Sequence, residues 1–220
     1  MAAAHALRSP ALAPGSRVTL VTGGPAPAAN YAAGVQRRVA QALHRLRIDV
    51  VPDACVGLGA GEIMLAKGQR LACDAPLLAL GAQAPAWLSG SGLCLDAGGF
   101  VSVNSFQQSI SHPEVFAAGD VASRVDAPHV RSGVYAVRAG PPLLGNLLAA
   151  MAGQALRHYS PQNRTLNLLS CGEKKAIAVW GGASLSGSWV WRLKDRIDRK
   201  FVATYTTDLK FNKKSSSPIV

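Results

Sequence analysis

The stretch Ile110-Ser111-His112-Pro113-Glu114-Val115-Phe116-Ala117-Ala118-Gly119-Asp120 decides how the rest of the chain is interpreted. Its apolar run predicts a buried strand over 115–118 that ends in a glycine and a carboxylate. Ligands of open α/β sheets bind at such carboxyl ends of strands. Gly119 would let the backbone approach a ligand closely, and Asp120 could accept a hydrogen bond from a ligand hydroxyl. The alternative from these residues alone is an ordinary turn in which Asp120 caps a helix.

Upstream of this motif, the sequence predicts a strand, a helix and a strand in succession. Residues 17–21 are rich in β-branched side chains and stop at Thr22-Gly23-Gly24-Pro25. Over 31–47 the apolar residues recur at helical spacing, and they are Val35, Val39, Ala42, Leu43 and Leu46. Residues 48–51 then form a short apolar strand. This order is a βαβ unit, which predicts parallel pairing of the two strands.

The remaining elements are predicted from turns and periodicity. Segments 63–66 and 70–72 flank Lys67-Gly68 and predict a hairpin. Further strands are expected over 76–80, over 99–103 and within 165–179, around a Cys171-Gly172-Glu173-Lys174 turn. A helix is expected from Val134 to Met151, bent or restarted by Pro141-Pro142 and closed by Gly153. Residues 188–201 predict a basic amphipathic helix, and the polar tail at 206–220 is expected to be disordered.

The composition is that of a folded, basic chain. Of 220 residues, 49% are hydrophobic and 16% are charged, and the net charge is +11. Such an excess attracts phosphates, anionic lipid or nucleic acid, although a solvated basic surface explains it equally well. The sequence has no RNP string, zinc spacing or recognisable helix-turn-helix, so nucleic acid is not an expected partner.

Four scattered cysteines, at 55, 73, 94 and 171, predict neither a metal site nor a disulfide scaffold, and buried or half-buried thiols are expected. No apolar run reaches membrane-spanning length, so a soluble or at most peripheral protein is expected. No carboxylate side chain precedes Asp49. An organelle transit peptide is therefore considered for 1–16, and a cytoplasmic location is the favoured expectation.

The motif at 110–120 resembles the second FAD-binding motif of FAD-dependent pyridine nucleotide-disulfide oxidoreductases, with Ile110 where a threonine usually stands. Residues 17–21 resemble the second strand of that family's NAD(P)-binding domain. Ala79-Leu80-Gly81-Ala82-Gln83-Ala84-Pro85 resembles its return crossing into the flavin domain. Residues 131–141 and 189–198 resemble a branch related to type II NADH dehydrogenases, often fused ahead of selenophosphate synthase (selenide, water dikinase). The resemblance covers about 17–201, the C-terminal half of the family's fold.

The resemblance implies an α/β chain: a partial two-dinucleotide-binding-domain (Rossmann-like) flavoprotein fold with a small C-terminal α+β region. The implied segments are a variable N-terminus (1–16), the remainder of an NAD(P)-binding domain (17–90), the second segment of an FAD-binding domain (91–155), a C-terminal region (156–205) and the tail. The implied cofactor is FAD, with NAD(P)H as substrate and a small-molecule electron acceptor. The implied FAD-binding residues are Gly81, Gly119, Asp120, Val121, Val134, Tyr135 and Ala136. No catalytic residue is assigned. An association with selenophosphate synthase is a further implication.

Two features of that family are absent from the sequence. Neither of its G-x-G-x-x-G turns occurs, and Gly57-Leu58-Gly59-Ala60-Gly61-Glu62 is interpreted as a loop that no helix follows. There is also no redox CxxxxC pair. Two functions therefore stay open. One is a partial FAD-dependent oxidoreductase that is inactive by itself, and the other is a non-catalytic interaction or membrane-peripheral protein, with Trp189, Leu193, Ile197 and Phe201 on one edge of the basic helix.

Overall fold

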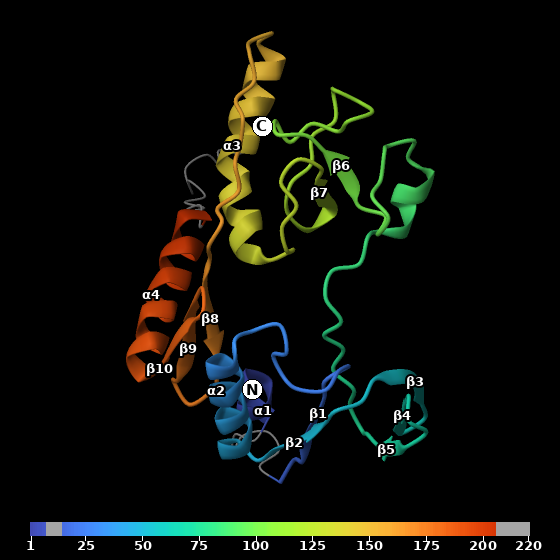
Figure 1. Cartoon of the computed structure of the whole chain (residues 1–220), viewed down its shortest axis with the longest axis vertical. Coiled ribbons are helices and arrows are strands. Elements are labelled where there is room, and N and C mark those ends of the chain that lie inside the picture. Colours follow the sequence, from blue (N-terminus) through green and yellow to red (C-terminus); the bar gives the residue numbers. More distant parts are fainter. Residues whose placement is uncertain (8–14, 206–220) are drawn as a thin grey trace, which may run out of the picture. The chain divides into compact units, whose positions relative to one another are not determined.

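The computed structural model describes residues 1–7 and 15–205, and it divides into two compact units (Figure 1). The first unit comprises Met1–Ala75 with Leu166–Val220, and the second comprises Pro76–Thr165. The elements of the first unit are α1 (Ala2–Leu7), β1 (Val18–Val21), α2 (Ala33–Arg45), β2 (Ile48–Val51), β3 (Cys55–Gly59), β4 (Glu62–Leu65), β5 (Arg70–Ala72), β8 (Leu166–Ser170), β9 (Ala176–Trp180), β10 (Ala183–Gly187) and α4 (Ser188–Tyr205). Those of the second are η1 (Ala86–Gly90), β6 (Val101–Val103), η2 (Gly119–Val121), β7 (Ala122–Arg124) and α3 (Gly133–Met151).

The core of the first unit forms around α2, where the apolar residues recur at helical spacing. The side chains that α2 buries are Val35, Val39, Ala42 and Leu43. They pack with Ile48 of β2 and with Ile177 and Val179 of β9. The predicted βαβ unit is confirmed, because β1 and β2 pair in parallel from Val18 with Ile48 to Val21 with Val51.

The segment between β2 and the second unit is an antiparallel three-stranded sheet. The predicted hairpin is confirmed as β4 and β5. The loop predicted over 57–62 is wrong in part, because Gly57 and Gly59 lie in β3, which pairs with β4. A tight turn follows, in which Gly61 has φ +75°, a conformation that glycine adopts at little cost. As expected, no helix follows this glycine-rich stretch.

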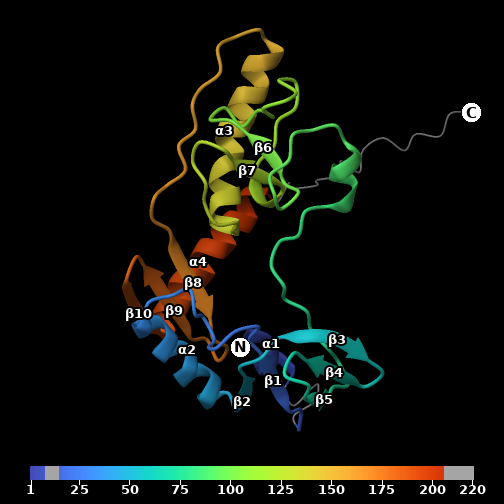
Figure 2. The ribbon, with the colours of Figure 1, turned by 45° about the vertical axis from the view of Figure 1, so that its right-hand side comes forward.

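The last part of the first unit is a second antiparallel sheet, in the order β10-β9-β8, followed directly by α4 (Figure 2). Strands β8 and β9 confirm the prediction for 165–179, and α4 confirms the predicted helix. Strand β10 was not predicted, because Ala183-Ser184-Leu185-Ser186-Gly187 has little β-branched character. The predicted tail lies outside the described residues.

The second unit is built on the parallel pair β6 and β7, with α3 beside it in both views (Figures 1 and 2). Leu88, Val101 and Val103 form its core. Helix α3 runs through Pro141 and Pro142 without interruption, so the predicted restart is wrong. The donors missing at the two prolines would have paired with the carbonyls of Val137 and Arg138, both exposed residues that water can solvate.

Two predicted strands of the second unit do not form. Residues 76–80 have no strand assignment, and Leu77 is 80% exposed. Over 115–118 only Phe116 makes an isolated bridge, to Gln108. A strand is held by a neighbouring ladder, and neither segment has such a neighbour among the described residues. Gly119 and Asp120 therefore precede a strand, β7, instead of following one. The strand expected at 99–103 is confirmed as β6.

Candidate functional site

A pocket of the second unit surrounds Gly119 and Asp120. The pocket offers about 20 Å³ of space to water-sized groups, room for about one water molecule. The empty space is about 350 Å³ when solvent at the open mouth is included. The walls come from β6, β7, η2, the first turns of α3 and the loops beside them. The lining residues are Val103, Gln107, Ala117, Ala118, Gly119, Asp120, Ala122, Arg124, His129, Arg131, Ser132, Tyr135, Ala136, Ala139 and Tyr159.

Gly119 allows η2 to lie directly against α3. Its φ is +72°, and a Cβ atom built there would come within 3.3 Å of the Ala136 Cβ. Both facts favour glycine at this position, because a left-handed backbone and a close approach each penalise a side chain. The next residue, Asp120, is exposed at the mouth of the pocket. Its carboxylate makes no hydrogen bond or ion pair within residues 1–7 and 15–205, so it is available to a ligand.

Buried polar atoms without partners line the pocket. The Gln107 side chain donates a hydrogen bond from Nε2 to the Ala139 carbonyl of α3 (3.1 Å), and the residue is only 2% exposed. Its Oε1 atom and the Tyr159 hydroxyl have no partner in the described part of the chain. Such groups lose solvation without compensation unless water or a ligand satisfies them. A polar ligand in the pocket could therefore donate a hydrogen bond to Gln107 Oε1 and form another with the Tyr159 hydroxyl.

A buried guanidinium fixes one wall of this pocket. Arg124 donates two hydrogen bonds to Asp126, each of 2.9 Å, and a third of 2.9 Å to the Tyr159 carbonyl. The hydrogen bonds from Arg124 hold the pKa of Asp126 below its usual value, and burial opposes them. Burial raises the pKa of the Tyr159 phenol, while the charge of Arg124 opposes this shift. Tyr159 therefore keeps its proton at neutral pH and can donate it in a hydrogen bond.

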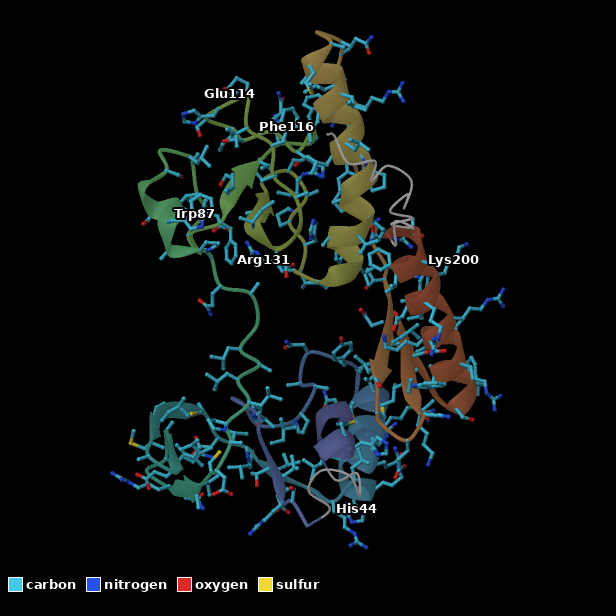
Figure 3. All side chains as sticks on the ribbon, turned by 180° about the vertical axis from the view of Figure 1, so that it is seen from behind. His44, Trp87, Glu114, Phe116, Arg131 and Lys200 are labelled. Carbon is cyan, nitrogen blue, oxygen red and sulfur yellow. The ribbon has the colours of Figure 1, made fainter. Side chains whose placement is uncertain are left out.

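The N-terminus of α3 closes the other side of the pocket. Ser132 is its N-cap and makes no capping bond through its side chain, so the first N–H groups of the helix are left for another acceptor. The His129 ring stacks on Tyr135 with centroids 4.2 Å apart. Arg131 lies in the loop that leads into α3 (Figure 3), packs over the Phe100 ring and pairs with Asp96 at 3.1 Å. Since Asp96 balances the charge of Arg131, the positive potential at this end of the pocket comes from the N-terminus of α3.

The structure brings together some of the residues predicted from sequence and leaves others apart. Gly119, Asp120, Tyr135 and Ala136 all line the pocket. Val121 packs on the core of the second unit, and Val134 is half-buried outside the lining. Gly81 is exposed, with nothing within 4 Å of a Cβ atom built on it. That these residues bind FAD stays a prediction.

Sequence reasoning missed Gln107, Arg124 and Tyr159. Gln107 stands in the loop before the motif and Tyr159 beyond α3, so only the tertiary fold places them together. Arg124 was recognisable in part, since an arginine two residues before Asp126 is a local ion-pair signal. The expectation for the thiols is also wrong at Cys55, which is exposed on the short strand β3.

A comparison with protein-family models identifies the family of the chain. The model of the family described as pyridine nucleotide-disulphide oxidoreductase matches residues 2–140. The chain belongs to this family. As the family name indicates, its members are pyridine nucleotide-dependent oxidoreductases, and the fold class expected from sequence, a Rossmann-like flavoprotein α/β fold, is confirmed.

Solved structures show the same fold at low identity. The sulfide:quinone oxidoreductase of Aquifex aeolicus matches with a TM-score of 0.72 at 14% identity, over 92% of this chain and 53% of that protein. A ferredoxin reductase from Rhodopseudomonas palustris matches with a TM-score of 0.59 at 16% identity, over 83% and 52%. Fdr9 matches at 0.52 and 26% identity, over 74% and 48%. The chain spans about half the length of these proteins.

Two further findings concern the described residues alone. No group of three or more histidine, cysteine, aspartate or glutamate side chains there is placed to hold a metal ion. None of the helices in 1–7 and 15–205 has the length and hydropathy needed to cross a membrane.

Proposed function

We propose that this chain forms one half of an FAD-dependent oxidoreductase that takes electrons from NAD(P)H and passes them to a small acceptor. The observation that carries the proposal is the pocket at Gly119 and Asp120, with the unpartnered Gln107 Oε1 at its base. Family membership supports the general reaction. The 220 residues contain no G-x-G-x-x-G turn, so the amides that hold the cofactor's phosphates must come from residues outside them.

The residues present fit the flavin and ribitol end of FAD. Asp120 would accept a hydrogen bond from a ribitol hydroxyl, and Gln107 Oε1 would accept one from a ring N–H. The Tyr159 hydroxyl and the free N–H groups at the start of α3 would donate to ring oxygens and stabilise negative charge there. When bound, FAD would supply the hydride and electron chemistry. The protein's part in this proposal is to orient the ring and to limit the access of water.

Flavin binding is the direct test. The purified chain, mixed with FAD and passed through gel filtration, is expected to retain a substoichiometric amount, measured by absorbance near the flavin band. Asp120→Ala should remove that residual flavin, because the variant loses the ribitol contact. Glu114→Ala is the matched control, since Glu114 is an exposed carboxylate of the same unit outside the pocket (Figure 3). Equal flavin content in Asp120→Ala and in the unchanged chain would disprove the site.

The same preparation tests activity. Because both phosphate-binding turns are absent, the isolated chain is expected to show no steady NADH oxidation with ferricyanide or a quinone. Turnover by the pure chain would contradict the proposal that it is half of the catalytic unit.

The branch and the acceptor form a finer part of the proposal. We infer a relation to type II NADH dehydrogenases, and an association with selenophosphate synthase, from the residues at 131–141 and 189–198. The structural match to a putidaredoxin reductase in complex with putidaredoxin supports a separate electron acceptor in general, at 17% identity and a TM-score of 0.57. Co-purification of the chain with selenophosphate synthase tests the association, and its absence at micromolar concentration of both proteins would remove it.

A second candidate function is a non-catalytic, membrane-peripheral role, and α4 is the observation that favours it. Trp189, Leu193, Ile197 and Phe201 recur every fourth residue along α4 and all are exposed. Two ion pairs, Lys194–Asp198 at 2.6 Å and Arg199–Asp195 at 2.8 Å, reduce the positive charge of the helix. Binding to anionic liposomes at low salt that disappears in Arg192→Glu/Arg196→Glu would support this role. No binding at low salt would eliminate it.

A further inference from the structure

A second concavity lies wholly within the first unit, between α2 and the sheet β8–β10. It offers about 110 Å³ of space to water-sized groups. The floor is apolar and includes the buried residues Ala42, Cys171 and Ile177. The walls carry three cations, Arg38 and Arg45 from α2 and Lys175 from the turn that precedes β9. We call this concavity the basic cleft.

The charges around the basic cleft are not balanced. Arg45 Nε lies 3.1 Å from the Glu173 carboxylate, and Lys175 Nζ lies 3.5 Å from the same oxygen. The single Glu173 carboxylate therefore forms ion pairs with two cations. Arg38 has only neutral partners, because its hydrogen bonds go to serine hydroxyls. No acidic residue lines the cleft itself, and with Glu173 counted the three cations leave an excess of two positive charges.

Arg38 is held in place before any ligand arrives. Its Nε donates to Ser184 Oγ at 3.2 Å and its Nη1 donates to Ser186 Oγ at 2.9 Å. The Nη2 group has no partner within the described residues. A guanidinium fixed by its neighbours loses little side-chain entropy when it binds an anion, and its remaining donors match the oxygens of a phosphate.

The turn between β8 and β9 gives the opposite wall a fixed form. Gly172, Glu173 and Lys174 have φ values of +76°, +51° and +52°, and left-handed backbone is uncommon for residues other than glycine. Hydrogen bonds of 2.9 Å close the turn on both sides, from Cys171 N to Lys175 O and from Lys175 N to Gly172 O. Backbone strain of this kind persists where the surrounding structure enforces it, and it holds Glu173 and Lys175 next to α2.

We propose that the basic cleft binds a single phosphate group, with Arg38, Arg45 and Lys175 as its ligands. The space of about 110 Å³ is several times what one water molecule requires, which leaves room for one small oxyanion. The apolar floor offers no competing acceptor. This site is independent of the proposed flavin pocket, which belongs to the other unit.

A titration followed by amide NMR tests the proposal on the intact 22.9 kDa chain. Inorganic phosphate is added while sodium chloride is reduced to keep the ionic strength constant. Amide shifts of Arg38, Gly172 and Lys175 are expected to saturate in the millimolar range. Arg38→Gln should weaken the apparent affinity at least about fivefold. Arg37→Gln is the matched control, because Arg37 is an exposed neighbour on α2 outside the cleft and carries the same charge.

Each outcome supports or overturns the site. Equal weakening by Arg37→Gln and Arg38→Gln would show diffuse attraction to a basic surface and overturn it, as would shifts that do not saturate. Lys175→Gln provides a second variant if Arg38→Gln does not fold, and it should weaken binding in the same way. Glycerol phosphate as a second ligand separates the sources: tighter binding than inorganic phosphate points to a phosphorylated metabolite, and equal binding to the free ion. Binding of an oligonucleotide without any binding of the small phosphates would overturn the proposal.

Discussion

Within residues 1–7 and 15–205, a parallel pair of strands occurs in each unit, and the two pairs differ in how much of their surface is buried. All three residues of β6 are buried, and Val103 is fully inaccessible. In the other pair, Leu20 of β1 and Val50 of β2 are partners in the register, and they are 37% and 38% exposed. Parallel strands are usually covered on both faces. The pair β6–β7 meets that condition more closely than β1–β2 does.

The difference indicates where the fold would accept further elements. The pair β1–β2 has a helix, α2, packed at the end where Ile48 is buried, and it lacks cover around Leu20 and Val50. The segments 76–80 and 115–118 have strand-like sequences and no ladder. The chain spans only 53% and 52% of two of the solved structures that it matches, and further strands of such a fold would supply neighbours of this kind.

The largest expected effect comes from placing a charge in the covered pair. Val103→Asp should destabilise the second unit by about 4 kcal/mol or more, because it buries an unpaired carboxylate and removes core packing. Leu20→Asp in the exposed pair should cost only about 1 kcal/mol. Hydrogen exchange measured by mass spectrometry reports each unit separately, with peptides from β6 and from β1. Equal loss of protection in the two variants would mean that the exposed pair is as well packed as the covered one.

A core truncation in the first unit should have the next largest effect. Leu43 is buried on α2 in the core that includes Ile48, so Leu43→Ala should lower the free energy of unfolding by about 2–4 kcal/mol. Leu58→Ala on the exposed strand β3 is the matched control and should cost less than about 1 kcal/mol. Urea denaturation followed by far-ultraviolet circular dichroism measures both. A similar midpoint shift for the two would contradict the assignment of the core to α2.

Two glycine substitutions in the second unit test how closely η2 approaches α3. Gly119→Ala should destabilise by about 1–2 kcal/mol, because its backbone is left-handed and its Cβ would crowd Ala136. Gly145→Ala within α3 meets nothing within 4 Å and should stabilise by about 0.5–1 kcal/mol. Thermal melts of the two variants should therefore shift in opposite directions. A neutral Gly119→Ala would show that the contact is looser than its geometry indicates.

The first unit was largely predictable because its signals are local. The spacing of Val35, Val39 and Leu43 indicates the helix and its buried face together, and the strands on either side follow from β-branched runs. The hairpin at 63–72 is marked by its turn. By contrast, β10 carries serine and glycine where a strand usually carries β-branched residues, so it forms because β9 pairs with it.

The candidate site was predictable at its motif and not around it. Gly119 and Asp120 stand in a string with a recognisable form, and Tyr135 and Ala136 follow in the next helix. Gln107 and Tyr159 line the pocket because the tertiary fold brings them there. No periodic pattern in the sequence predicts such a placement. The strand expected before Gly119 was wrong for a related reason: apolar residues predict a strand, but a strand also needs a neighbour, and sequence patterns do not reveal whether one is present.

The smallest expected effect is a pH-dependent change in the stability of the second unit. It comes from Asp126, which pairs with Arg124 in the wall of the pocket. Hydrogen bonds from Arg124 lower the pKa of Asp126 in the folded state, so this carboxylate contributes stability that is fully present above its unfolded pKa, 3.8. The contribution is lost as the pH falls through the lower, folded value. Because the Asp126 side chain is 44% exposed, solvent screening keeps it to about 1 kcal/mol. Asp126→Asn should therefore shift the urea midpoint of the second unit most at about pH 7 and less at about pH 3, which lies below the unfolded pKa of 3.8. Subtracting the variant from the unchanged chain at each pH cancels the other acidic groups, Asp96 among them. A difference that stayed constant between the two pH values would show that Asp126 acts through packing, and that the Arg124 wall does not depend on its charge.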